Sequence, residues 1–198
     1  MATKTTLLDS VNVILSNIGQ APVTNLETPN PMVNLAVGMI QEVSRQVQAE
    51  GWVFNTEDEY PLPRDINNEI LIADNVLQMD LSRFTRFDVV LRSGKLYDKT
   101  NHTYQFDSDL KAFITWIFPF DEVPEAFKNY ITIRAANLFA ARVVGSQEVV
   151  KYSQQEETIA RSAMIEYETQ QGDYNMLGAR DGRNVVSGYM PIDTIYRY

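Results

Sequence analysis

Residues 50–62 read EGWVFNTEDEYPL, and the character of the chain changes within this stretch. Before it, apolar residues recur at helical spacing, whereas after it β-branched and aromatic residues cluster between turn signals. Gly51 therefore predicts the end of a helix, and residues 52–54 predict an apolar plug between a helical body and an inserted β region. The residues predicted to form this domain junction are Gly51, Trp52 and Phe54.

The acids at positions 57–59 allow two interpretations. They are either the solvated start of the β region or a carboxylate group beside an aromatic platform, as in an enzyme that cleaves glycans. A glycosidase needs two carboxyl groups about 5–9.5 Å apart across the scissile bond, one of them desolvated enough to stay protonated. Along a strand Glu57 and Glu59 would share one face and Asp58 would lie on the other. Because sequence adjacency does not supply the catalytic geometry, we favour the solvated start.

Two amphipathic helices are predicted before this stretch. In the first, apolar residues from Leu7 to Ile18 recur at spacings of three and four, and Gly19 follows the last of them. Thr6 and Asp9 have the spacing of a capping box at its start. The second and longer helix is predicted to begin at Pro31, with Asn30 as its N-cap, and to continue to Gly51.

The inserted region, residues 52–118, is predicted to be a mainly antiparallel β domain. Its clearest signal is Ser93-Gly94, which lies between two short β-type runs and favours a two-residue hairpin. Further strands are predicted at Thr103–Phe106 and Ala112–Phe118. The last of these is apolar on both faces, so we expect it to be the central strand.

Helical spacing returns after the β region. Asp121–Glu125 is an acid-rich helix start, and the helix that follows has almost no wholly polar face, so it should be the most buried. Gly145 is predicted to end it, and Ser146 to cap a fourth helix that runs to Gly172. The apolar stripe predicted for this fourth helix comprises Val149, Tyr152, Ile159, Ala163 and Tyr167.

The last segment, residues 172–198, contains four glycines and many apolar and tyrosine side chains without a sustained period. This composition is typical of an extended arm that lies on another surface. The predicted fold class is therefore α+β: a four-helix bundle-like body (1–51 and 119–171), an inserted β domain (52–118) and an extended C-terminal arm (172–198).

The overall composition limits the classes of function. The chain of 198 residues has 44% hydrophobic residues and a net charge of −9, so a surface that grips nucleic acid phosphates is not expected. It has no cysteine, which excludes disulfides, thiolate metal sites and cysteine nucleophiles. The N-terminal segment lacks the uninterrupted apolar core of a signal peptide, and no apolar run is long enough to span a membrane. We expect a protein made and used, or assembled, in the cytosol.

Other candidate sites are weaker than their structural alternatives. His102 is the only histidine, so it cannot build a multi-histidine zinc site, and a surface histidine is the favoured interpretation. Asp107–Asp109 opens like a calcium loop but lacks the glycine and distal glutamate, which favours a turn. Glu156 and Glu157 point in different directions on a helix. Trp52 and Trp116 could stack on sugars, although their apolar surroundings favour a core role. No catalytic residue, cofactor or metal is predicted.

Four segments, in this order and spacing, resemble the tail tubular protein A family of short-tailed bacteriophages, the adaptor between the portal and the tail nozzle. They are LLDSVNVILSNIGQAPV, QAEGWVFNTED, FDEVPEAFKNYITIRAA and YETQQGDYNML. The helix-Gly-x-x-Pro opening and the GW-x-F-N junction are the most specific parts. The resemblance extends over roughly residues 6–178.

This resemblance implies a structural protein of the virion tail, assembled in the host cytoplasm. It implies a twelve-fold ring attached to the portal, with the helices side by side around the ring, the β insertion facing the nozzle, and double-stranded DNA passing through the lumen without sequence-specific binding. The family pattern supplies no catalytic motif, and a tail-associated glycan-binding or glycan-hydrolysing protein remains the alternative. The arm residues predicted to contact the portal or a neighbouring subunit are Tyr174, Arg180, Arg183, Tyr189, Tyr196 and Tyr198.

Overall fold

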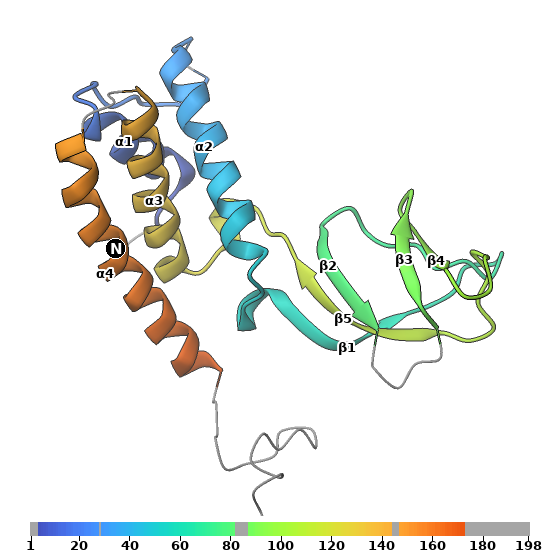
Figure 1. Ribbon diagram of the computed structural model, residues 1–198. Coiled ribbons are helices and arrows are strands. Elements are labelled where there is room, and N and C mark those ends of the chain that lie inside the picture. The colour runs from blue at the N-terminus through green and yellow to red at the C-terminus, as the bar shows by residue number, and fades with distance from the viewer. Residues whose placement is uncertain (1–3, 28, 82–86, 144–146, 173–198) are drawn as a thin grey trace, which may run out of the picture.

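The computed structural model describes residues 4–27, 29–81, 87–143 and 147–172. It confirms an α+β fold, in which a helical body and antiparallel strands follow one another along the molecule (Figure 1). The helices are α1 (Leu7–Asn17), α2 (Pro31–Gln48), α3 (Glu125–Val143) and α4 (Gln147–Gln171), with short 3₁₀ turns η1 (Val53–Asn55) and η2 (Phe120–Glu122). The strands are β1 (Thr56–Leu62), β2 (Val76–Leu81), β3 (Val89–Arg92), β4 (Lys95–Asp98) and β5 (Leu110–Trp116).

The predicted starts of α1 and α2 are confirmed. Thr6 and Asp9 form the capping box, each side chain bonding to the other residue's backbone N–H, and Asn30 caps α2 by accepting from the Met32 N–H at 2.9 Å. Gly19, at φ +73°, ends α1 in a left-handed turn, as the sequence predicts. α2 ends at Gln48, earlier than predicted, and Gly51 instead turns the chain at φ +78°.

Helix α3 lies at the centre of the helical body and contacts α1, α2 and α4 (Figure 1). It contributes more buried residues than any other helix among the described side chains, so the prediction for it is confirmed. Phe127 and Ile131 are fully buried in a core that also takes residues from the other three helices. Burial of this apolar surface is the main stabilising contribution to the body.

The fourth helix forms, but its predicted apolar stripe is wrong in phase. Ile159 is 70% exposed and Ala163 is exposed, whereas Ala160 and Met164 are buried. The buried side of α4 lies one residue later, at Ala160, Met164 and Glu168, although Tyr167 of the predicted stripe is partly buried against the core. The side chains of Val149 and Tyr152, and the predicted boundary at Gly145 and Ser146, lie outside the described residues.

The strands form a three-stranded antiparallel sheet of order β1-β5-β2 and the separate hairpin β3-β4. The central place of β5 and the hairpin turn at Ser93-Gly94 are confirmed, and both turn residues have positive φ. Two details of the prediction are wrong. β5 ends at Trp116 and buries mainly one face, since Phe113 is 44% exposed.

Thr103–Phe106 makes only isolated bridges instead of a strand, because the chain turns back on itself at Asp98. Asp98 accepts hydrogen bonds from the Thr100 N–H at 2.8 Å and from the Asn101 side chain at 2.7 Å. Burial raises the pKa of this carboxyl, but the hydrogen bonds from Asn101 and Thr100 outweigh burial, so the net shift is below the usual value.

The depressed pKa of Asp98 predicts acid sensitivity of the turn at residues 98–103. The stabilisation should be complete above the ordinary carboxyl pKa of 3.8 and lost as pH falls through the lower folded-state value. Amide exchange of Thr100 should therefore rise steeply below about pH 3.8 relative to that of the β5 amides, after correction for the intrinsic rate. Asp98→Asn should show the faster Thr100 exchange already at neutral pH; equal protection of Thr100 in both proteins would contradict this role.

Candidate functional site

The predicted junction residues lie between the helical body and the strands. Trp52 and Phe54 pack against Phe127 of α3, with ring centroids 5.2 and 4.7 Å away, so both rings belong to the helical core. Phe118, on the returning chain, lies 6.3 Å from Phe54. Val53 does not join this plug: its side chain is 42% exposed, because the η1 turn directs it outward while its flanking rings point in.

Two buried amides that the sequence analysis missed hold the two junction segments together. Asn55, 1% exposed, donates to the carbonyls of Gln48 and Trp116, each at 2.8 Å, and accepts from the Trp52 N–H. Gln48 pairs in both directions with the backbone of Phe118, at 2.8 and 3.0 Å. The chain passes between the body and the strands twice, after α2 and after β5. The side-chain amides of Gln48 and Asn55 join these two segments, and each amide both donates and accepts hydrogen bonds.

Contacts from β1, β2 and β5 also reach the segment that follows α2. Gln78 of β2 donates to the Ala49 carbonyl at 3.0 Å, just after the end of α2. A Cβ at Gly51 would meet side-chain atoms of Thr56 and Thr115 at 3.5 and 3.6 Å, and its φ of +78° favours glycine in any case. The geometry is that of a braced connection; whether it separates two domains at the predicted boundaries remains a prediction.

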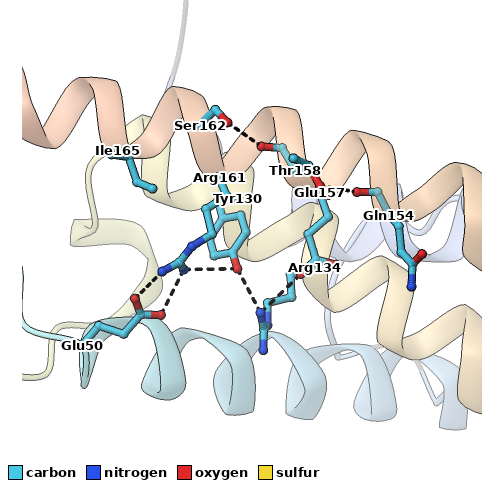
Figure 2. A pocket seen from close by; sticks show the side chains of 9 residues that line it. All are labelled: Glu50, Tyr130, Arg134, Gln154, Glu157, Thr158, Arg161, Ser162 and Ile165. Atoms are coloured by element: carbon cyan, nitrogen blue, oxygen red, sulfur yellow. Dashed lines mark hydrogen bonds and ion pairs between the residues drawn. The ribbon is translucent and has the colours of Figure 1, made fainter.

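Beside the junction, a groove of about 790 Å³ is lined by side chains of α3 and α4 and by Glu50, just beyond the end of α2 (Figure 2). Arg161 of α4 forms a bidentate pair with Glu50, at 3.1 and 2.6 Å. Arg134 of α3 donates to Tyr130 at 2.9 Å and to Glu157 at 3.3 Å, and Arg161 also reaches the Tyr130 hydroxyl. The full lining is Glu50, Tyr130, Arg134, Gln154, Glu157, Thr158, Arg161, Ser162 and Ile165.

The charged side chains of this groove pair with one another, although the buried Nε of Arg134 has no hydrogen-bond partner within the described part of the chain. The Glu50 carboxylate is the main cause of a raised pKa at Arg161, which keeps the guanidinium charged at any ordinary pH. Glu157, a candidate carboxylate from the sequence, lines the groove, but its two oxygens already accept from Arg134 at 3.3 Å and from Asn137 at 3.2 Å. The described residues of the groove therefore form an interhelical polar network, and none of them pairs a nucleophile with an adjacent base.

The remaining candidate carboxylates are also not opposed across a cleft. Glu57 accepts from the Trp116 indole N–H at 3.0 Å and Glu59 pairs with Lys111 at 2.8 Å, which lowers the pKa of Glu59 by hydrogen bonding and charge. The expected alternation of 57–59 is wrong, because a bulge with Glu59 at φ +53° interrupts the strand. All three acids are exposed, as expected for a solvated start of the β region.

His102 and the Asp107–Asp109 stretch occupy turns. His102 is exposed at φ +54°, and its Nδ1 lies 3.5 Å from the Tyr97 hydroxyl. Asp109 accepts from the Arg64 backbone and side chain, an arrangement that closes a loop. Among the described residues, no group of three or more His, Asp or Glu side chains could hold a metal, and no helix is both long and apolar enough to cross a membrane.

The six arm residues predicted to bind the portal or a neighbouring subunit, from Tyr174 to Tyr198, lie outside the residues that the structure describes. Their role stays a prediction.

Comparison with known proteins supplies the family. The family model described as tail tubular protein matches residues 8–174, which include all four helices almost completely and all five strands. The chain is also 24% identical over 170 residues to tail tubular protein A of Klebsiella phage KP34, covering 81% of this chain and 86% of that protein. The chain therefore belongs to the tail tubular protein family, and its role is a structural one in a phage tail.

Proposed function

We propose that this chain is a head-to-tail adaptor: a ring between the phage portal and the tail nozzle, through which DNA leaves the head. The observation that carries the proposal is the family match over residues 8–174, because it includes the helical body, the junction and the strands together. A protein matched over one element alone would support no such role.

The braced junction supports an adaptor function. An adaptor must hold two binding regions in a fixed relation, and here buried amides and aromatic rings fasten the helical body to the strands. The arm at residues 172–198 carries three basic and three acidic residues, so the rest of the chain carries the whole net charge of −9. A lumen of that sign would repel phosphates and let DNA slide without sticking.

A closed ring requires a heterologous interface, in which one surface of each copy meets a different surface of the next. We propose that the copies meet through their helical bodies, twelve to a ring, and that the arm fastens each copy to the portal or to its neighbour. Native mass spectrometry and electron microscopy of the purified protein mixed with portal and with nozzle protein test this. Rings bound to portal are expected; absence of a complex with either partner would reject the adaptor function, whereas a free monomer would not.

Truncation after Gly172 is expected to leave the described fold intact and to abolish docking to the portal. The reason is that every core residue that the structure describes precedes Gly172, whereas the sequence of residues 172–198 combines apolar and tyrosine side chains with four glycines and no sustained period. Circular dichroism and portal co-sedimentation measure the two effects. A full-length variant with Tyr189→Ala and Tyr196→Ala tests the same arm without shortening the chain, and it should dock weakly. Unchanged assembly of the truncated chain would show that the arm is dispensable.

A further inference from the structure

Two side chains of α4 reach into the junction segment on either side of Gly51. The Arg161 guanidinium binds the Glu50 carboxylate through two hydrogen bonds, at 3.1 and 2.6 Å (Figure 2). Two helical turns further on, the Glu168 carboxylate accepts from the Val53 backbone N–H at 2.7 Å. Residues 50–53 are thus held from the α4 side by two charged groups on one face of the helix.

The contacts of Arg161 and Glu168 are a large part of what holds this half of α4 against the rest of the protein. Among its described side chains, residues 154–171, only Ala160 and Met164 are buried apolar residues, and Tyr167 is partly buried against Phe127. α3, by contrast, places a row of large apolar side chains in the core. Segments with few buried apolar contacts are those that open locally at the lowest free energy.

The packing of α4 depends on the junction through Glu168. Its side chain is 7% exposed, and a buried carboxylate that loses its hydrogen-bond donor is strongly destabilised. The Val53 N–H has the same dependence, since the described structure satisfies it through Glu168. Displacing either segment therefore removes the partner of a group on the other.

We infer that the C-terminal half of α4 and junction residues 50–55 are energetically coupled, so that loosening either segment loosens the other. The chain continues beyond Gln171 directly from this helix. A partner that binds or pulls the chain there would act on the junction, and through it on the strands, by way of Arg161 and Glu168. The inference concerns a single copy of the chain and does not depend on a ring.

Hydrogen exchange with mass spectrometry on the full chain tests the coupling. In the Arg161→Ala, Glu168→Ala double variant, which removes both contacts, amides at 50–55 and at 161–172 are expected to exchange about tenfold faster together, while those of α1 and α3 keep their rates. Arg142→Ala is the matched control: it removes another interhelical arginine–glutamate pair, to Glu42 at 3.5 Å, away from the junction. It should leave both segments unchanged.

The reciprocal variant guards against global unfolding. Glu50→Gln alters only the junction side of the contact, and coupling requires it to accelerate exchange in α4 at 161–172. Faster exchange at 50–55 with unchanged α4 in this variant, or faster exchange in α4 with a protected junction in the double variant, would overturn the inference.

Discussion

Replacing Phe127 with alanine is expected to lower the free energy of unfolding by about 3–5 kcal/mol, the largest effect of any single substitution considered for this chain. Phe127 is fully buried, and its ring contacts Trp52 and Phe54 of the junction and Tyr167 of α4, with centroids 4.7–6.2 Å away. The cavity would thus open where three segments meet, and the surrounding rings are too constrained to fill it.

Urea denaturation followed by circular dichroism measures this loss. Phe113→Ala on β5 is the matched control, since the same side chain is removed from a site that is 44% exposed, and it should cost well under half as much. Equal losses for the two variants would show that Phe127 is not the packing centre of the junction.

The second large effect is expected for Asn55→Ala, at about 3 kcal/mol. The substitution removes the Asn55 partner of the Trp116 carbonyl and of the Trp52 N–H in a buried site, and leaves the Gln48 carbonyl with the Gly51 N–H at 3.2 Å. Each buried group left unpaired costs roughly 1–3 kcal/mol, although relaxation and entering water recover part of the total. Asn55→Asp should also be damaging, because a carboxylate cannot donate to the two carbonyls.

Asn34→Ala supplies the comparison, because Asn34 is exposed on α2, where alanine is a better helix former. Its stability should be unchanged or slightly raised. Chemical denaturation of both variants decides the matter: an Asn55→Ala protein as stable as Asn34→Ala would mean that the amide network does not fasten the junction.

The features that could be predicted from the sequence are those determined within a few residues. The capping box of α1, the Asn30 cap and the Ser93-Gly94 hairpin follow from contacts between close neighbours in the chain. The wrong phase of α4 has the opposite origin. Its packing side is set by tertiary contacts with α3 and with the distant junction at Val53, so apolar spacing along α4, with Ile159 exposed, does not reveal it.

The candidate site shows the same limit. Trp52 and Phe54 are prominent in the sequence, whereas Gln48 and Asn55 are ordinary amides whose role depends on the chain returning at Trp116 and Phe118. A weak signal existed for Gln48, which continues the buried side of α2 one turn beyond Ser44. A polar residue in that position predicts a buried hydrogen-bond partner but does not identify it.

The outer strand β1 has a consequence for how copies of this chain behave when they are crowded. Within the described residues its outer edge pairs with no strand, and β1 carries Glu57–Glu59, a bulge at Glu59 and a proline at position 61. Like charges repel, a bulge breaks the register and proline lacks an N–H, so each of the three discourages the addition of a foreign strand. We therefore expect the acids that first suggested an active site to discourage edge-to-edge association of copies through β1.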